Sequence, residues 1–218
     1  MTPVSDFVNA FSAYPLIALL GYVFGASNMA IYLAKWKGVD LAAGGSGNPG
    51  ASNALILMGW RAAVLVCVHD LIKCNLAVYL AGLLFPEVAC ARAVAGVASI
   101  LGQMYPFYTH FRGGKGFAAY LAVTLALDWK FALCLYAVLI VVLIASNYVV
   151  VCTFTTITVV PIYFACTGRV PEALLLCVAT AAMLWKHREN ITRLKNGTEI
   201  GVRAASRGEH RVRSRKQG

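Results

Sequence analysis

The chain has 218 residues, of which 60% are hydrophobic and 13% charged, and its mean hydropathy is +0.70. Soluble domains carry about 25% charged residues, so this composition leaves too little polar surface to cover a globule in water. It excludes an ordinary soluble domain and predicts an integral membrane protein. The seven cysteines are scattered, with no C-x-x-C spacing, and predict no metal site.

Positive charge is concentrated near the C-terminus. The formal net charge is +10, and ten of the nineteen Lys and Arg residues lie between Lys186 and Lys216. A basic tail that follows a hydrophobic span is attracted to anionic headgroups by about 1 kcal/mol per cationic side chain. This placement favours membrane lipids as partners and argues against nucleic-acid binding.

Apolar stretches recur along the chain, and each predicts a membrane helix. They cover residues 14–34, 55–85, 89–104, 117–127, 131–146, 148–166 and 172–185. The predicted fold class is therefore all-α, a polytopic membrane protein of about seven transmembrane helices. We expect residues 1–200 to form this membrane domain and residues 201–218 to form a flexible basic cytoplasmic tail.

The distribution of charge between loops predicts the orientation. Fourteen Lys and Arg residues fall in segments 35–54 and 105–116 and in the tail, whereas the opposite loops hold only Arg92, Lys130 and Arg169. The positive-inside rule places the C-terminus in the cytoplasm and the N-terminus outside. The three segments richest in Gly, Asn, Lys and His then meet at the cytoplasmic face.

The first of these segments, residues 44–53, reads GGSGNPGASN. Its glycines allow backbone N–H groups to converge on an anion, and its Ser and Asn side chains add polar groups, which indicates a phosphate site. The alternative is a flexible turn between helices. Gly45, Gly47 and Gly50 also match the dinucleotide fingerprint, but that fingerprint requires a preceding strand.

The stretch that follows contains an acid and a base three residues apart, Asp70 and Lys73. These residues share one face of a helix and are expected to pair, because an unpaired charge in the bilayer costs about 2.5 kcal/mol or more. Structural anchoring and direct catalysis remain equal alternatives for this pair.

The second segment, FRGGKG at residues 111–116, sets Lys115 among glycines where a helix opens. Mobile positive charge and a helix N-terminus both favour an anion. The segment is not a Walker A loop, because Gly116 occupies the place of the Ser or Thr that would hold magnesium. The alternative is a lysine whose ammonium extends to the membrane boundary.

The third segment, residues 187–199, begins with HREN. On a helix His187, Asn190 and Leu194 share one face, so that a histidine and an amide point into the mouth of the bundle. Histidine is a candidate general base or hydrogen-bond donor. The alternative is an interfacial histidine without a chemical role.

In order and spacing, these motifs resemble those of the bacterial acyl-phosphate-dependent glycerol-3-phosphate acyltransferase family, over roughly residues 14–200. The resemblance implies a bacterial plasma-membrane enzyme of phospholipid synthesis, with its active site facing the cytoplasm. Such an enzyme moves a fatty acyl group from acyl phosphate to the 1-hydroxyl of glycerol 3-phosphate and forms lysophosphatidic acid without a cofactor or metal. It also implies functional links to upstream and downstream lipid-synthesis enzymes.

The resemblance also implies roles for individual residues. The residues expected to act in catalysis are Ser46, Asn48, Lys115, His187 and Asn190. Substrate binding is expected of Gly45, Gly47, Gly50, Ser52, Asn53, Arg112, Gly113, Gly114, Gly116, Thr153 and Glu199. The Ser and Asn side chains would hold phosphate or carbonyl oxygens, and Lys115 would neutralise a phosphate. Whether His187 or a substrate phosphate takes the proton stays open.

Four positions depart from the family pattern. Ile56 and Asn147 stand where the family usually has arginine, Gln103 where it has histidine, and Val150 where it has serine. Two alternatives therefore stay beside the main hypothesis. One is an enzyme with the same donor and a different acyl acceptor, and the other is a non-catalytic lipid-binding or transport protein.

Overall fold

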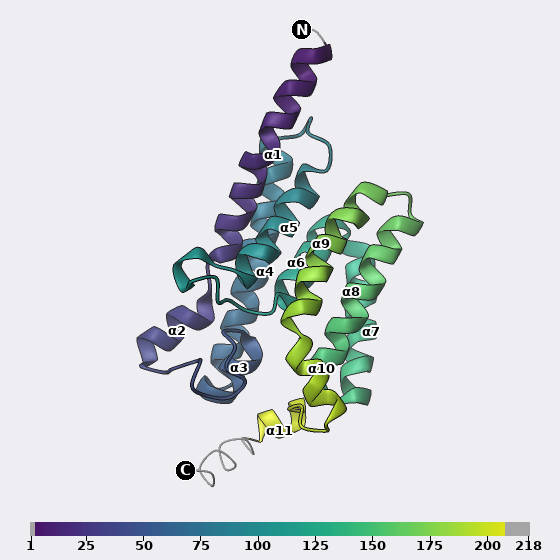
Figure 1. The fold of residues 1–218 in the computed structure, drawn as a ribbon. Coiled ribbons are helices and arrows are strands. Elements are labelled where there is room, and N and C mark those ends of the chain that lie inside the picture. The colour runs from purple at the N-terminus through teal and green to yellow at the C-terminus, as the bar shows by residue number, and fades with distance from the viewer. Residues whose placement is uncertain (1–2, 208–218) are drawn as a thin grey trace.

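The computed structural model describes the backbone of residues 3–207 and the side chains of residues 12–205 and 207. Within that range every regular element is a helix (Figure 1), so the all-α prediction is confirmed. The elements are α1 (Pro3–Ala26), α2 (Met29–Lys37), α3 (Ala51–Met58), α4 (Trp60–Leu84), α5 (Ala91–Met104), the 3₁₀ turn η1 (Phe107–Thr109), α6 (Phe117–Leu127), α7 (Trp129–Ser146), α8 (Val149–Cys166), α9 (Val170–Lys186), α10 (Arg188–Lys195) and α11 (Val202–Ser206). The predicted tail lies outside the described residues from position 208 onward.

Four helical segments are long and apolar enough to cross a bilayer. They are Ser12–Lys37, which runs through α1 and α2, and the segments Trp60–Leu84, Trp129–Ser146 and Val149–Cys166. The remaining bundle helices α5, α6 and α9 have 14, 11 and 17 residues, fewer than the roughly 20 that a spanning helix usually needs. Seven spans therefore remain a prediction.

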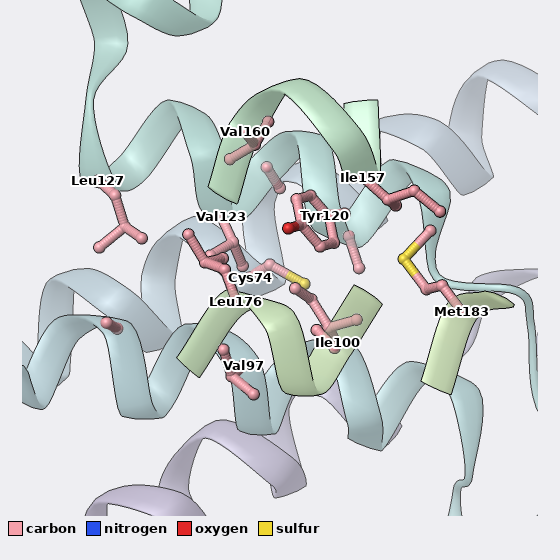
Figure 2. Packing of buried hydrophobic residues seen from close by; sticks show 14 of the residues in the cluster. Cys74, Val97, Ile100, Tyr120, Val123, Leu127, Ile157, Val160, Leu176 and Met183 are labelled. Atoms are coloured by element: carbon pink, nitrogen blue, oxygen red, sulfur yellow. The ribbon is translucent and has the colours of Figure 1, made fainter. Parts of the chain in front are cut away.

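The bundle has two halves, which α6 and a direct contact between α5 and α9 join (Figure 1). Helices α1, α4 and α5 pack together, as do α7, α8 and α9, and α6 contacts members of both groups. Tyr120 and Val123 of α6 are fully buried in the shared core, with Ile100 of α5 and Leu176 of α9 around them (Figure 2). This burial holds the short α6 in place and so fixes the position of Lys115 just before it.

Two of the predicted apolar stretches are each broken into two helices. The first breaks after Ala26, where the side chain of Asn28 accepts a hydrogen bond of 3.2 Å from the Ile31 amide and caps α2. The second breaks at Gly59, whose φ of 87° is a conformation that residues with a side chain rarely adopt. The short helices α2 and α3 consequently lie with their connecting loop at one end of the bundle (Figure 1).

Helices α1 and α5 approach closely where both lack side chains. A Cβ atom on Gly25 would lie 2.0 Å from the carbonyl oxygen of Ser99, and one on Gly102 would lie 2.3 Å from that of Tyr22. With Gly21, Gly25 forms the G-x-x-x-G spacing that lets membrane helices pack backbone against backbone. The hydrophobic pattern of the sequence does not show this contact.

The predicted pairing of Asp70 with Lys73 is confirmed, with 2.9 Å between Oδ1 and Nζ and both side chains buried. Lys73 also donates hydrogen bonds to the carbonyl oxygens of Gly25, at 2.9 Å, and Ser27. The break after α1 leaves these oxygens without helical donors. The third acceptor is Gln103 Oε1, while Gln103 Nε2 donates to Asp70 Oδ2 at 3.0 Å. One lysine therefore ties α1, α4 and α5 together.

Adding a single methyl group at Gly25 tests this contact. We expect Gly25→Ala to destabilise the protein by about 1–3 kcal/mol, because the methyl group forces α1 away from the Ser99 carbonyl. The measurement is thermal unfolding in detergent, followed by circular dichroism. The control is Leu19→Val on the exposed face of α1. An equal fall in midpoint for both variants would contradict the close packing.

Candidate functional site

The glycine-rich loop between α2 and α3 is braced by Asn53. This buried side chain accepts a hydrogen bond of 2.8 Å from the Ser46 amide and donates one of 2.9 Å to the Leu41 carbonyl. Gly45 has a φ of 61°, and a Cβ atom there would lie 2.1 Å from Asn53 Oδ1. Asn53, predicted to bind substrate, is thus engaged in holding the loop, and Gly45 leaves room for it.

The other polar side chains of this loop are available to a ligand. Ser46 and Asn48 are half-buried, Ser52 is exposed at the start of α3, and none has a side-chain hydrogen bond to the rest of the described chain. Asn28 fixes the loop from outside, because its Nδ2 donates to the Pro49 carbonyl at 3.1 Å. A rigid backbone with free hydroxyl and amide groups suits an anionic ligand.

The FRGGKG loop folds back on the end of α5. The amides of Gly113 and Gly114 donate to the carbonyl oxygens of Met104, at 3.1 Å, and Gln103, at 3.0 Å. A Cβ atom on Gly113 would lie 2.4 Å from the Gln103 carbonyl, so only glycine fits there. One on Gly114 would lie 3.4 Å from the carbonyl oxygen of Pro49. The two glycine-rich loops, far apart in sequence, are therefore neighbours.

His187 lies at the joint between α9 and α10 and is buried. Its Nδ1 lies 2.8 Å from the carbonyl oxygen of Met183. Because a carbonyl oxygen only accepts, Nδ1 carries the proton, and in the neutral ring Nε2 is the acceptor. Burial, the largest effect, and the nearby ammonium of Lys115 lower the pKa of His187 below its ordinary 6.5, so the ring is neutral at pH 7.

A hydrogen-bonded network joins Lys115 to α10. The Lys115 ammonium donates to Asn190 Oδ1, and Asn190 Nδ2 donates to Glu199 Oε1 at 2.7 Å. Arg193 Nε donates to the other carboxylate oxygen of Glu199 at 2.9 Å. Burial first, and Arg193 second, lower the pKa of Lys115 from 10.5. The network holds two cations close to one carboxylate and leaves net positive charge beside the loops.

Two other predicted site residues, Thr153 and Arg112, take no part in this network. Thr153 is buried in α8, and its hydroxyl donates to the Val149 carbonyl of the preceding turn at 3.2 Å. The Arg112 side chain is exposed. Conversely, Arg193 belongs to the network although it was not among the predicted site residues. Its place three residues after Asn190 on one helix is the signal that would have identified it.

Positions that depart from the family pattern have clear structural roles. Asn147 ends α7 with a φ of 66°. Its Oδ1 accepts a hydrogen bond of 3.0 Å from the backbone amide of Arg203, and its carbonyl oxygen accepts one of 2.9 Å from the backbone amide of Val202. Asn147 thereby ties α7 to α11, which packs on α3. Ile56 is buried in α3, and its Cγ2 would lie 3.2 Å from a Cβ atom on Gly45.

Removing Glu199 tests the network. We expect Glu199→Ala to speed amide hydrogen exchange over residues 190–200 by about tenfold or more, because Asn190 and Arg193 lose a charge-assisted hydrogen bond each. The control is Glu189→Ala, whose carboxylate is exposed and 3.7 Å from Arg193. Exchange that is unchanged by Glu199→Ala would mean that the carboxylate does not hold α10.

Comparison with known proteins agrees with this geometry. The family described as glycerol-3-phosphate acyltransferase matches residues 15–197. Curated relatives of that name come from Rubrobacter xylanophilus, 37% identical over 185 residues (84% of this chain, 92% of the relative), and Brucella anthropi, 34% identical over 187 residues (85% and 92%).

Solved structures agree as well. The crystal structure of PlsY (YgiH), an integral membrane glycerol 3-phosphate acyltransferase in its glycerol 3-phosphate form, has a TM-score of 0.81 and 31% identity, covering 87% of this chain and 95% of that one. Its lysophosphatidic acid form has a TM-score of 0.78 and 30% identity over the same shares. The chain therefore belongs to the glycerol-3-phosphate acyltransferase family.

Proposed function

We propose that this integral membrane protein transfers a fatty acyl group from acyl phosphate to the 1-hydroxyl of glycerol 3-phosphate and so forms lysophosphatidic acid for phospholipid synthesis. The observation that carries the proposal is the joining of two glycine-rich loops beside the Lys115 network. Both substrates carry phosphates, and the site offers free loop donors on one side and an ammonium on the other.

The chemistry requires positioning and charge neutralisation. An acyl phosphate is already activated, so its carbonyl carbon is attacked directly by the acceptor hydroxyl and phosphate leaves. Lys115 neutralises the phosphate charge, and Ser46, Asn48 and Ser52 hold phosphate or carbonyl oxygens. Asn190 orients the acceptor.

His187 is the proposed proton acceptor. With Nδ1 fixed on Met183, the neutral ring has its lone pair on Nε2 and is able to take the hydroxyl proton at pH 7. Glu199 and Arg193 act through Asn190 and Lys115, whose side chains they hold in place. Glu199 and Arg193 therefore support residues that act on the substrates and do not contact the substrates themselves.

The orientation is part of the same proposal. We place seven spans in the bacterial plasma membrane, at α1, α4, α5, α6, α7, α8 and α9, with the N-terminus outside. The basic loops and α10 then face the cytoplasm, where soluble glycerol 3-phosphate reaches the site. Trp36 and Trp60, both exposed near the cationic side chains of Lys37 and Arg61, support an interface at this end of the bundle.

The proposal is tested with purified protein in lipid, palmitoyl phosphate and radiolabelled glycerol 3-phosphate. We expect lysophosphatidic acid from the wild type and at least a hundredfold less from Lys115→Ala, because the phosphate charge is no longer neutralised. The control is Lys130→Ala, whose exposed side chain lies over Trp129 at the start of α7. Equal rates for the two variants would remove Lys115 from the mechanism.

A second candidate function uses the same acyl-phosphate donor and a different acyl acceptor. The observation that favours it is that Ile56 and Asn147 stand where the family usually has arginine. It predicts that Ile56→Arg and Asn147→Arg together raise activity with glycerol 3-phosphate. The proposed function predicts the opposite, a loss of about tenfold, since Asn147→Arg removes the hydrogen bond that holds Arg203 and α11. Initial rates of the wild type and the double variant with glycerol 3-phosphate distinguish the two functions. If neither protein turns over or binds the donor, only a non-catalytic role remains.

A further inference from the structure

A groove of about 580 Å³ opens between α1, α2 and α4. Apolar side chains make up most of its lining, including Val23, Leu65 and Ile72. Its polar lining residues are Ser27, His69 and Lys73. Neither Ser27 nor His69 takes part in the acyl transfer proposed above. The volume and the apolar lining suit a fatty chain, and the polar groups meet at one place.

Ser27 and His69 form a hydrogen-bonded pair, the arrangement by which a histidine activates a serine hydroxyl. The Oγ atom of Ser27 lies 3.0 Å from His69 Nε2. The hydroxyl of Tyr32 donates to the same Oγ at 3.3 Å, which leaves the Ser27 proton directed to the imidazole. On the far side of the ring, Nδ1 lies 3.7 Å from Asp70 Oδ1.

The donors around Asp70 determine which ring nitrogen is protonated. Lys73 has three N–H groups, and they go to Gly25, Ser27 and Gln103. Asp70 Oδ1 therefore pairs with the ammonium through charge, yet it accepts no hydrogen bond. His69 Nδ1 is buried and has no hydrogen-bond partner either within the described chain. A proton on Nδ1 directed at Oδ1 satisfies both atoms and makes Nε2 the acceptor for Ser27.

The 3.7 Å separation between His69 Nδ1 and Asp70 Oδ1 is longer than a hydrogen bond. Hydrogen bonds of catalytic groups are commonly long without substrate and shorten when it binds. The nearby α2 begins at Met29, two residues after Ser27, and the amides of Met29 and Ala30 have no acceptor within the described chain. These two amides are donors suited to a negative carbonyl oxygen beside Ser27.

We propose that Ser27, His69 and Asp70 form a second reactive centre, which hydrolyses fatty acyl esters held in this groove. Ser27 Oγ bonds to the acyl carbonyl carbon while His69 Nε2 takes its proton. The bond from that carbon to the alcohol oxygen breaks, and the alcohol leaves with the proton from His69. Water then attacks the Ser27 ester and gives a proton to His69, which passes it to Ser27 Oγ as the bond from Oγ to the acyl carbon breaks and the fatty acid leaves.

Covalent labelling tests the nucleophile. The full chain in mild detergent is treated with an alkyl fluorophosphonate, which reacts with activated serine hydroxyls, and the modified peptide is located by mass spectrometry. We expect the adduct on Ser27, with a labelling rate about a hundredfold lower in His69→Phe. The control His110→Phe changes an exposed histidine and is expected to label as the wild type does. No adduct on Ser27 in folded wild type, or equal labelling in His69→Phe, overturns the proposal.

Hydrolysis of 4-nitrophenyl decanoate tests the complete reaction and separates it from acyl transfer. We expect wild type and Lys115→Ala to release 4-nitrophenol at similar rates, and Ser27→Ala to lose the activity. Thermal unfolding of each variant confirms that it is folded. Release that survives Ser27→Ala, or that disappears with Lys115→Ala, assigns the hydrolysis to the other site and overturns the proposal. Failure of lysophosphatidic acid formation alone leaves this result unaffected.

Discussion

The buried ammonium of Lys73 is the interaction on which the rest of the structure depends. Helix α1 has to end inside an apolar bundle, and its last carbonyl oxygens need donors that no lipid supplies. Lys73 supplies them to Gly25 and Ser27, while Asp70 balances its charge. Because α2 begins just after this break and leads into the glycine-rich loop, Lys73 helps to determine where that loop lies.

Asn28 also stabilises the irregular backbone at this break. Asn28 caps α2 through Oδ1 and holds the Pro49 carbonyl through Nδ2, and it is fully buried. Lys73 and Asn28, together with Tyr108, whose hydroxyl donates to the Ala26 carbonyl at 2.7 Å, thus supply the hydrogen bonds of the backbone at this break. Removing Lys73 or Asn28 leaves buried polar groups unpaired, which costs more than the contact itself contributes.

Much of this molecule could be predicted from its sequence, because membrane helices and polar loops differ so strongly in composition. The apolar stretches, the pairing of Asp70 with Lys73 and the meeting of the segments that carry Lys115 and Asn190 follow from spacing, charge and residue type. The broken helices do not follow, because Asn28 and Gly59 lie within hydrophobic runs whose mean hydropathy hides them. The role of Asn53 in holding its loop could not be predicted either, because the residue type alone does not tell which groups an amide side chain hydrogen-bonds to.

The Lys115 network also determines when the site becomes complete during synthesis. Lys115 and both glycine-rich loops are synthesised before α6 is complete, whereas its network partners Asn190, Arg193 and Glu199 follow α9. The hydrogen bond between Asn147 and Val202 likewise forms only after Val202 has been synthesised. A chain that stops in α9 contains all the loops and leaves the ammonium of Lys115 without its partners. The Lys115 network is therefore complete only once the residues after α9 have been synthesised.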